Sequence, residues 1–314
     1  MSALVSSPVH VTVFGYGYWG RNVARAMREG GMHVSVYDVD GQAATRAVKA
    51  GYGHKPTREI ALRESGAVAI CTPPNEHAGL VEAALRAGKH VWVEKPVADD
   101  PAKSADLIAA AHAAGLALFV DHTFTFAPAV DVLAAELPNF VGTIMSARAH
   151  LCVPRAGADV IGDLLPHDAS ILIRCGLNVR RAMASDWNTS ARVDLDLAAD
   201  GRASIFLSWD SALKERRMTF YGERCTVVYD ALDPREPVRV YGGSASDDVA
   251  AFSQVAARSP AVASDEPLAR AVAAFQAAIE GRAPDNADVA LRVERVVWAA
   301  RRSVRSAGWV EAGA

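Results

Sequence analysis

Near its N-terminus the chain reads VHVTVFGYGYWG over residues 9–20, and a helix-like segment, Arg21–Arg28, follows. The apolar half of the quoted stretch predicts a buried strand, and its glycines predict a tight turn into the helix. Gly15 permits the turn, Gly17 lets the backbone approach a pyrophosphate, and Gly20 allows close packing of helix against strand. Such an order of strand, glycine turn and helix is typical of a dinucleotide site.

The second strand supports this interpretation. Val34–Tyr37 reads as a strand and ends in Asp38, close to the spacing of about 20 residues at which such folds carry a ribose-binding acid. A carboxylate there accepts hydrogen bonds from the ribose diol and repels a 2′-phosphate, so it favours NAD(H) over NADP(H). A GxGxxG string alone occurs in many glycine-rich turns, but the strand, helix and acid around it favour a cofactor site.

Length, net charge and hydropathy limit the classes of protein to which the chain can belong. A chain of 314 residues is long for one core, which predicts two domains. The net charge of −3 provides no field for nucleic acid or an acidic membrane. No apolar stretch approaches the ~20 residues of a spanning helix, and residues 1–8 lack the features of a signal peptide. We therefore expect a cytoplasmic protein that binds neither nucleic acid nor membrane.

The cysteines suggest no cross-link and no metal site. Cys71, Cys152, Cys175 and Cys225 lie far apart, without a CxxC pair. Neither a zinc site nor a disulfide framework is predicted, and we expect all four to be small buried hydrophobes.

The first part of the chain predicts a doubly wound parallel sheet. From residue 9 to about 125, short apolar runs alternate with amphipathic segments, which is the pattern of strands covered by helices. The further strands expected are Val68–Cys71, His90–Val93 and Leu116–Val120, and the further helices are Glu76–Ala87 and Pro101–Gly115. We assign residues 1–125 to this α/β domain.

The second part, residues 126–314, predicts an α+β domain on an open, mostly antiparallel sheet, because strand-like stretches now follow one another. These stretches are Thr143–Leu151, Arg192–Ala199, Ala203–Trp209, Arg216–Gly222, Thr226–Tyr229 and Val238–Tyr241. The helices expected are Gly162–Cys175, Pro267–Glu280 and Ala287–Ser306, and the last should pack back on the first domain. Gly242–Glu266 reads as a mobile surface loop.

Polar residues follow three strands of the parallel sheet, where ligands of such sheets bind. They are Thr72–His77, Glu94–Pro96 and Asp121–Thr123. Lys95 directly follows an apolar strand, so its ammonium should lie at the sheet edge near a nicotinamide. The alternative is a lysine that leaves the strand and is solvated.

A second group of polar residues lies on the helix predicted in the second domain. Asp163 and His167 are four residues apart and share a helix face, where a carboxylate can orient and charge-stabilise an imidazole. We expect Asp168 to contact backbone or a neighbouring helix. A satisfied surface pair is the alternative, and no metal site is expected because no third or fourth ligand lies nearby.

Together these residues resemble the Gfo/Idh/MocA family, the glucose-fructose oxidoreductase and inositol dehydrogenase group, over nearly the whole chain. The resemblance rests on Gly15–Asn22, Thr72–His77, Glu94–Pro96, Asp163–Asp168, and Ser208–Trp209 with Lys214–Arg217. It implies a Rossmann domain followed by an open, mostly antiparallel sheet, whose outer face would form a homodimer or homotetramer. It also implies a catalytic lysine at Lys95, an acid at Asp163 and a histidine at His167.

The resemblance further implies a cofactor set and a substrate set. The cofactor set is Gly15, Gly17, Tyr18, Trp19, Gly20, Asp38, Thr72, Pro73, Pro74, His77, Glu94 and Lys95. The substrate set is Lys95, His122, Thr123, Asp163 and His167.

Within the family, Val120–Val130 and Pro166–Ser170 resemble the branch that oxidises nucleotide-linked amino sugars at the 3-hydroxyl. Asp121 stands where that branch usually has Gly, and Ala127 where it usually has Asn. Such drift is typical of a relative that acts on another sugar, for example in secondary-metabolite biosynthesis.

The expected reaction is reversible hydride transfer between nicotinamide C4 and a carbinol or ketone carbon of a sugar-like substrate. In oxidation His167 would be the general base, Asp163 would orient its ring, and Lys95 would hydrogen-bond the developing oxyanion. Because fold does not fix reaction, two alternatives stay open. One is a redox-neutral or imine-reducing enzyme that retains its NAD, and the other is a non-catalytic NAD-binding protein.

Overall fold

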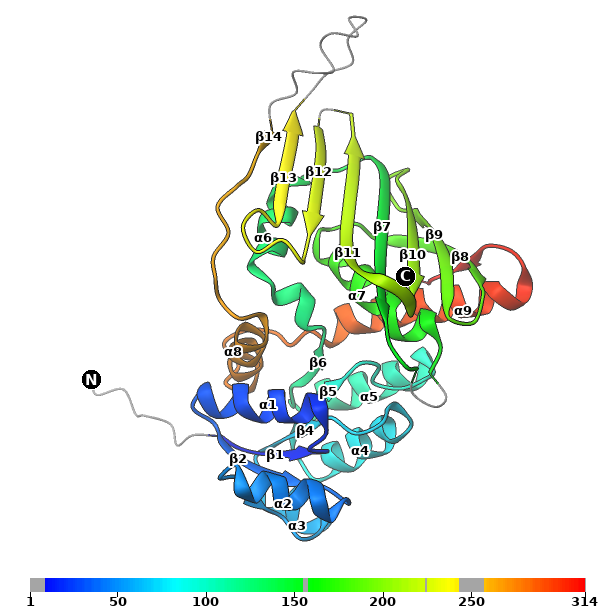
Figure 1. Cartoon of the computed structure of the whole chain (residues 1–314). Coiled ribbons are helices and arrows are strands. Elements are labelled where there is room, and N and C mark those ends of the chain that lie inside the picture. The colour runs from blue at the N-terminus through cyan, green and yellow to red at the C-terminus, as the bar shows by residue number, and fades with distance from the viewer. Residues whose placement is uncertain (1–8, 155–157, 224, 243–256, 314) are drawn as a thin grey trace, which may run out of the picture. The chain divides into compact units, whose positions relative to one another are not determined.

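The chain forms two compact units (Figure 1). The computed structural model describes residues 9–154, 158–223, 225–242 and 257–313. Unit 1 runs to Thr123 and includes Glu266–Leu291, and unit 2 consists of Phe124–Asp265 and Arg292 onward. The domain limits expected from the sequence, 1–125 and 126–314, stay a prediction.

Unit 1 is built on a six-stranded, wholly parallel sheet in the order β3-β2-β1-β4-β5-β6. Its strands are β1 (His10–Phe14), β2 (His33–Tyr37), β3 (Gly53–His54), β4 (Ala67–Ile70), β5 (His90–Glu94) and β6 (Leu118–Asp121). The predicted doubly wound sheet is thus confirmed. The strand order reverses between β1 and β4, and the carboxyl ends of the strands at such a switch point are where ligands bind.

Helices cover this sheet and bury its apolar side chains. They are α1 (Tyr18–Glu29), α2 (Gly41–Lys49), α3 (Arg58–Glu64), α4 (Pro74–Arg86), α5 (Pro101–Ala113) and α8 (Pro267–Ile279). α8 is distant in sequence but packs beside α1, where the Gln276 amide donates to the Gly30 carbonyl at 2.9 Å. α1 begins at Tyr18, before the predicted start at Arg21, because Gly17 already occupies its N-cap position.

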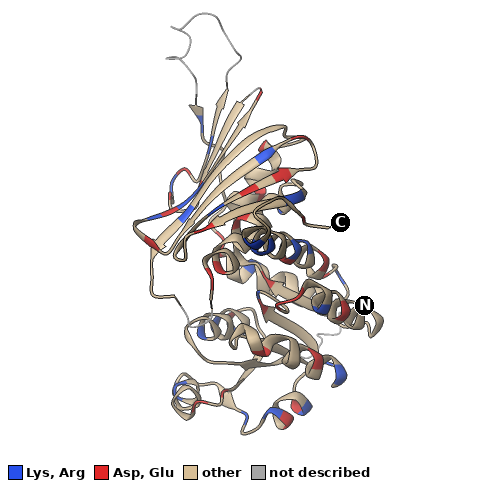
Figure 2. Ribbon diagram, turned by 90° about the vertical axis from the view of Figure 1, so that its right-hand side faces the viewer, with Lys and Arg blue, Asp and Glu red and all other residues tan. Residues whose placement is uncertain are grey.

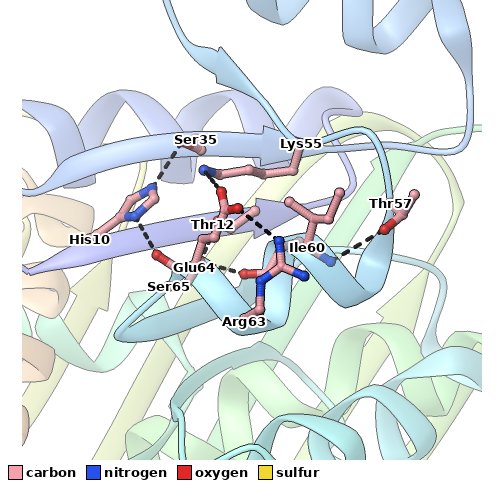
Figure 3. A network of polar contacts seen from close by, with 10 residues as sticks. His10, Thr12, Ser35, Lys55, Thr57, Ile60, Arg63, Glu64 and Ser65 are labelled. Carbon is pink, nitrogen blue, oxygen red and sulfur yellow. Dashed lines mark hydrogen bonds and ion pairs between the residues drawn. The ribbon is translucent and has the colours of Figure 1, made fainter.

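A polar network ties β1 and β2 to the end of α3 (Figure 3). The ring nitrogens of His10 lie 2.8 Å from the Glu64 carbonyl and 2.9 Å from Ser35 Oγ. Thr12, fully buried in the central strand, shares a hydrogen bond with Ser65. Because buried hydroxyls are costly without partners, this network allows β1 to keep a threonine in the middle of the sheet.

Unit 2 is built on a nine-stranded sheet in the order β14-β13-β12-β11-β7-β10-β9-β8-β15. Its strands are β7 (Gly142–Leu151), β8 (Val179–Asp186), β9 (Ser190–Leu197), β10 (Arg202–Ser208), β11 (Asp210–Gly222), β12 (Cys225–Asp230), β13 (Val238–Gly242), β14 (Ala257–Arg258) and β15 (Val310–Glu311). The mostly antiparallel sheet is confirmed. β7 and β10 are the exception and run parallel, which is possible because α7, β8 and β9 form a long crossover between them.

The helices of unit 2 are α6 (Pro128–Glu136), α7 (Val160–Arg174) and α9 (Ala287–Ser306), whose first turns belong to unit 1. α7 and α9 contribute to one apolar core with the inner face of the sheet. The outer face exposes Met145 on β7, Phe206 on β10 and Tyr221 on β11. The predicted homo-oligomer through this sheet stays a prediction.

Two further expectations concern loops and cysteines. Most of the loop predicted over Gly242–Glu266 lies outside the described residues, but Ala257–Arg258 forms β14 against β13. All four cysteines are free, and only Cys175 is buried, so the expected burial is wrong for the other three. No helix among the described residues has the length and apolar character needed to cross a membrane.

Candidate active site

The three glycines of the turn between β1 and α1 differ in what a Cβ atom would meet at each position. Gly15 has φ +88°, and a Cβ there would meet the Cys71 carbonyl oxygen at 2.8 Å. A Cβ on Gly20 would lie 1.9 Å from the Gly15 carbonyl oxygen. Around Gly17, by contrast, no described atom lies within 4 Å of a Cβ position. Gly15 and Gly20 therefore shape the turn, and Gly17 leaves open space above it.

This contrast gives a paired test. We expect Gly17→Ala to keep the stability of the wild type and to bind NADH at least about tenfold more weakly, because its methyl occupies the space where a pyrophosphate approaches. Gly20→Ala should instead lower the free energy of unfolding by about 2–4 kcal/mol through overpacking. Fluorescence titration with NADH and urea unfolding measure the two effects. Wild-type NADH affinity in Gly17→Ala would contradict the assignment of the turn.

The residues around the turn fit a dinucleotide. α1 has Gly17 as its N-cap residue and no side-chain cap, as is also the case for α4 and α8, whereas α2, α3 and α5 are capped by Asp40, Thr57 and Asp100. The N–H groups of its first turn are thus available to phosphate oxygens. Within the described residues, Thr72 Oγ1 and Glu94 Oε1 are also buried without a hydrogen-bond partner. Buried polar atoms of this kind are expected where a ligand supplies the missing partner.

Asp38 follows β2 and lies against the glycine turn. One carboxylate oxygen accepts from the backbone N–H of Tyr16 at 2.6 Å, and the other accepts from that of Asp40 at 2.8 Å. Because a carboxylate can accept about four hydrogen bonds, these contacts fix the side chain and leave capacity for a ribose diol. Tyr18, also in the predicted cofactor set, is 72% exposed.

His77 connects two of the polar segments predicted at the sheet edge. Its ring is fully buried, with Nδ1 2.7 Å from the Pro96 carbonyl oxygen and Nε2 2.9 Å from the Thr72 carbonyl oxygen. Both ring nitrogens are thus directed at backbone. The geometry points to His77 as a residue that positions the Thr72–Pro74 turn against the segment after β5.

Glu94 and Asp121 form an acidic pair at the ends of neighbouring strands. They are direct partners in the β5–β6 register. Burial, and then the negative charge of Asp121, raises the pKa of Glu94 well above its usual value. The Trp19 indole N–H donates to Asp121 at 2.9 Å, and the Thr123 hydroxyl donates to the other oxygen of Asp121. Trp19 and Thr123, predicted for the cofactor and substrate sets, are thus linked through Asp121.

Lys95 directly follows Glu94 in the chain, and its charge acts on a neighbouring histidine. Burial, and secondarily the Lys95 charge, lowers the pKa of His122 to about 3. The His122 ring is therefore neutral at physiological pH, and it can exchange hydrogen bonds without carrying charge.

In unit 2, α7 carries the predicted acid and imidazole. The helix starts at its N-cap Asp159, which accepts from the Gly162 N–H at 2.7 Å and pairs with Arg301 of α9 at 2.5 Å. A Cβ on Gly162 would lie 1.8 Å from the Arg301 guanidinium, so glycine lets that side chain cross the helix start. The first turn of α7, which includes Asp163, is thereby held in place.

Asp163 and His167 each contact an aromatic residue. The Trp209 indole N–H donates to Asp163 at 3.2 Å. The His167 ring meets the Phe124 ring edge-on, with centroids 4.8 Å apart. Neither aromatic was assigned a role from the sequence, although Trp209 lies in the Ser208–Trp209 motif that the resemblance used. The orientation of His167 by Asp163 stays a prediction.

The expectation for Asp168 was wrong. Its carboxylate is directed at the side chains of β7, accepting from Ser146 at 2.9 Å and from Arg148 at 2.5 Å. Asp168 and Arg148 are almost fully buried. Such a pair has to stay intact, because removing one partner leaves a buried charge at a cost of about 3–5 kcal/mol.

The predicted residues are divided between the units. Unit 1 holds the cofactor set, including Lys95, at or after the ends of β1, β2, β4 and β5, and it holds His122 and Thr123 of the substrate set after β6. Unit 2 holds Asp163 and His167 on one helix. Within the described residues, no group of three or more His, Cys, Asp or Glu side chains could hold a metal ion.

The fold of unit 1 and its glycine turn define a Rossmann domain of the dinucleotide-binding class. Residues 9–122 match the GFO_IDH_MocA family model, described as an oxidoreductase family with an NAD-binding Rossmann fold. The resemblance is thus confirmed for residues 9–122, which match an NAD-binding domain of this oxidoreductase family and lie within unit 1.

Curated relatives match over shorter stretches. UDP-N-acetylglucosamine 3-dehydrogenase of Acidithiobacillus ferrooxidans is 29% identical over 163 residues, which cover 51% of this chain and 52% of that protein. 4-Carboxy-2-hydroxymuconate-6-semialdehyde dehydrogenase of a Sphingobium species is 39% identical over 90 residues, covering 28% and 29%. The matches thus span about half or less of these relatives' length.

Whole-chain similarity is seen in solved structures. The structure of UDP-N-acetylglucosamine 3-dehydrogenase GnnA from Acidithiobacillus ferrooxidans superposes with a TM-score of 0.85 over 96% of this chain and 98% of that one, at 24% identity. At this identity the likeness establishes a shared fold across both units.

Proposed function

We propose that the protein is an NAD(H)-dependent oxidoreductase that transfers a hydride between nicotinamide and a carbinol or ketone carbon of a sugar or nucleotide-linked sugar. The main support is the open space above Gly17 at the uncapped start of α1, in a domain of an NAD-binding oxidoreductase family. Two relatives named above act on a nucleotide-linked sugar and on a carboxylated semialdehyde. Both named substrates are small polar molecules, which supports a substrate of that class for this protein.

The proposed division of work assigns each catalytic group one task. Bound NAD⁺ supplies the acceptor for the hydride. In the oxidation direction the substrate C–H bond breaks with its electron pair moving as hydride, the hydroxyl proton goes to His167, and a carbonyl forms. Lys95 hydrogen-bonds the oxygen on which charge develops, and Asp163 orients the imidazole. Asp38 selects NAD(H) by binding the ribose diol.

A single-turnover screen tests this proposal. The protein is used in excess over cofactor. For oxidation it is mixed with NAD⁺ or NADP⁺ and a free or nucleotide-linked sugar. For reduction it is mixed with NADH or NADPH and a ketone or an imine. We expect a substrate-dependent change in reduced-nicotinamide absorbance with NAD(H) and a sugar. Reduced cofactor that forms only transiently on the enzyme would favour the redox-neutral alternative. NADH binding with no absorbance change for any compound would contradict an oxidoreductase.

A further inference from the structure

Two guanidinium groups of unit 2 lie on one aromatic ring. The Cζ atoms of Arg148 on β7 and Arg216 on β11 are each 4.9 Å from the centroid of the Phe124 ring. The two arginines are direct partners in the antiparallel register of these strands. They therefore project from the same face of the sheet, where like charges directly opposite one another are destabilising.

Only one of these charges is balanced. Arg148 is 3% exposed and pairs with buried Asp168 at 2.5 Å. Across the ranges that the structure describes, no carboxylate lies at ion-pair distance from Arg216. Burial, and then the charge of Arg148, lowers the pKa of the Arg216 guanidinium. Arg216 is thus a partly buried cation held beside another cation, and this arrangement opposes folding.

The same ring brings Arg216 close to the proposed catalytic histidine. His167 meets Phe124 edge-on at 4.8 Å between centroids, so the imidazole and both guanidinium groups share one aromatic neighbour. His150 lies on the same strand as Arg148 and is subject to the same positive charges. Burial, and then the Arg216 charge, lowers its pKa, whereas Asp163 acts in the opposite direction.

The positive field is local. The whole chain has a net charge of −3, and Figure 2 shows Lys and Arg interspersed with Asp and Glu over the helices and strands. Arg148 is balanced by the Asp168 carboxylate and already lies over the Phe124 ring. The second guanidinium, that of Arg216, has Asp168 as a favourable charge, but not at ion-pair distance. A partly buried cation of this kind is the pattern expected where the closer partner is a ligand.

We propose that Arg216 binds an anionic group of the substrate, a phosphate or a carboxylate, close to the carbon on which His167 acts. This inference rests on the proposed function and narrows its substrate class to nucleotide-linked or acidic sugars, with neutral sugars excluded. The planar guanidinium suits either group, because it donates two parallel hydrogen bonds to phosphate or carboxylate oxygens. The contact with the Phe124 ring helps to hold the guanidinium in place.

The test compares Arg216→Met with Arg217→Met. Arg217 is the next residue on β11, projects from the opposite face of the sheet, and is exposed. Both variants remove one positive charge from the same strand. Binding of uridine diphosphate, glucuronate and glucose is measured by calorimetry in the presence of NADH, and this readout does not need turnover. The two anionic probes distinguish phosphate from carboxylate as the group bound.

We expect Arg216→Met to weaken binding of at least one anionic probe by about 10- to 100-fold and Arg217→Met to leave it nearly unchanged. Arg216→Lys should restore part of the affinity, and unfolding of Arg216→Met should show no loss of stability. The proposal would be overturned if the two Met variants bound the anionic probes with equal affinity, or if the wild type bound neither anion. It would also be overturned if Arg216→Met lost as much affinity for glucose as for the anions. If Arg216 binds anions but the single-turnover screen gives no absorbance change, the proposed function fails, and only the anion site at Arg216 stands.

Discussion

Lys95→Ala and His167→Ala should each lower turnover by about 10²- to 10⁴-fold while NADH binding is retained. Lys95 follows β5 beside the buried Glu94–Asp121 pair, and His167 lies one turn after Asp163 on α7. Each side chain is assigned a proton or an oxyanion in the reaction, and Lys95 is in addition one of the residues in the predicted cofactor set. The loss of either side chain should therefore appear mainly in kcat while NADH still binds.

The matched controls are Lys103→Ala and His112→Ala, which remove a lysine and a histidine from the surface of α5. Their side chains are 43% and 45% exposed. Turnover is followed by nicotinamide absorbance and NADH binding by fluorescence. If Lys95→Ala or His167→Ala turns over like its control, that residue has no part in the chemistry.

Asp38→Asn should shift the preference between NADH and NADPH by about 10- to 100-fold toward NADPH. The wild-type carboxylate is held at the turn by the Tyr16 and Asp40 N–H groups, so its charge has a fixed place. Removing it abolishes repulsion of a 2′-phosphate and weakens charge-assisted bonds to the ribose, each worth about 1.5–3 kcal/mol. The measurement is kcat/KM for both cofactors.

Asp40→Asn is the control for this substitution. Asp40 is the neighbouring acid, it caps α2, and Asn is an equally good capping residue. We expect its cofactor preference to match that of the wild type. A wild type that prefers NADPH, or an Asp38→Asn variant with an unchanged ratio, would contradict the role of Asp38.

Most strands and the longer helices could be predicted from the sequence because local patterns there agree with the final structure, whereas α2, α3, α6 and β8 were not predicted. Buried parallel strands such as Val91–Val93 are apolar on both faces. At each of its three positions in the turn, glycine meets a stated steric requirement of such turns. The pairing of distant elements left no local signal. The packing of α8 against α1 and the parallel pairing of β7 with β10 depend on contacts between residues far apart in the chain.

For the candidate site, too, only those positions could be predicted that local sequence determines. Lys95, Asp38 and the glycines could be placed because each adjoins a strand whose end it must occupy. The contact of Phe124 with Arg148 and Arg216 could not be placed, because three separate segments meet there. Arg216 lies in the Lys214–Arg217 motif, but no local pattern put it beside Arg148. The role of Asp168 was missed for the same reason, since its partners lie on a strand before α7.

Isotope exchange tests the central claim most directly. The protein is incubated with a nucleotide-linked sugar, a trace of NAD⁺, and NADH carrying deuterium at C4 on either face. Reversible hydride transfer predicts that deuterium from one face enters one carbon-bound position of the recovered sugar, and that Lys95→Ala and His167→Ala slow this entry. Sugar recovered without deuterium, under conditions where both NADH and the sugar are bound, would contradict the account.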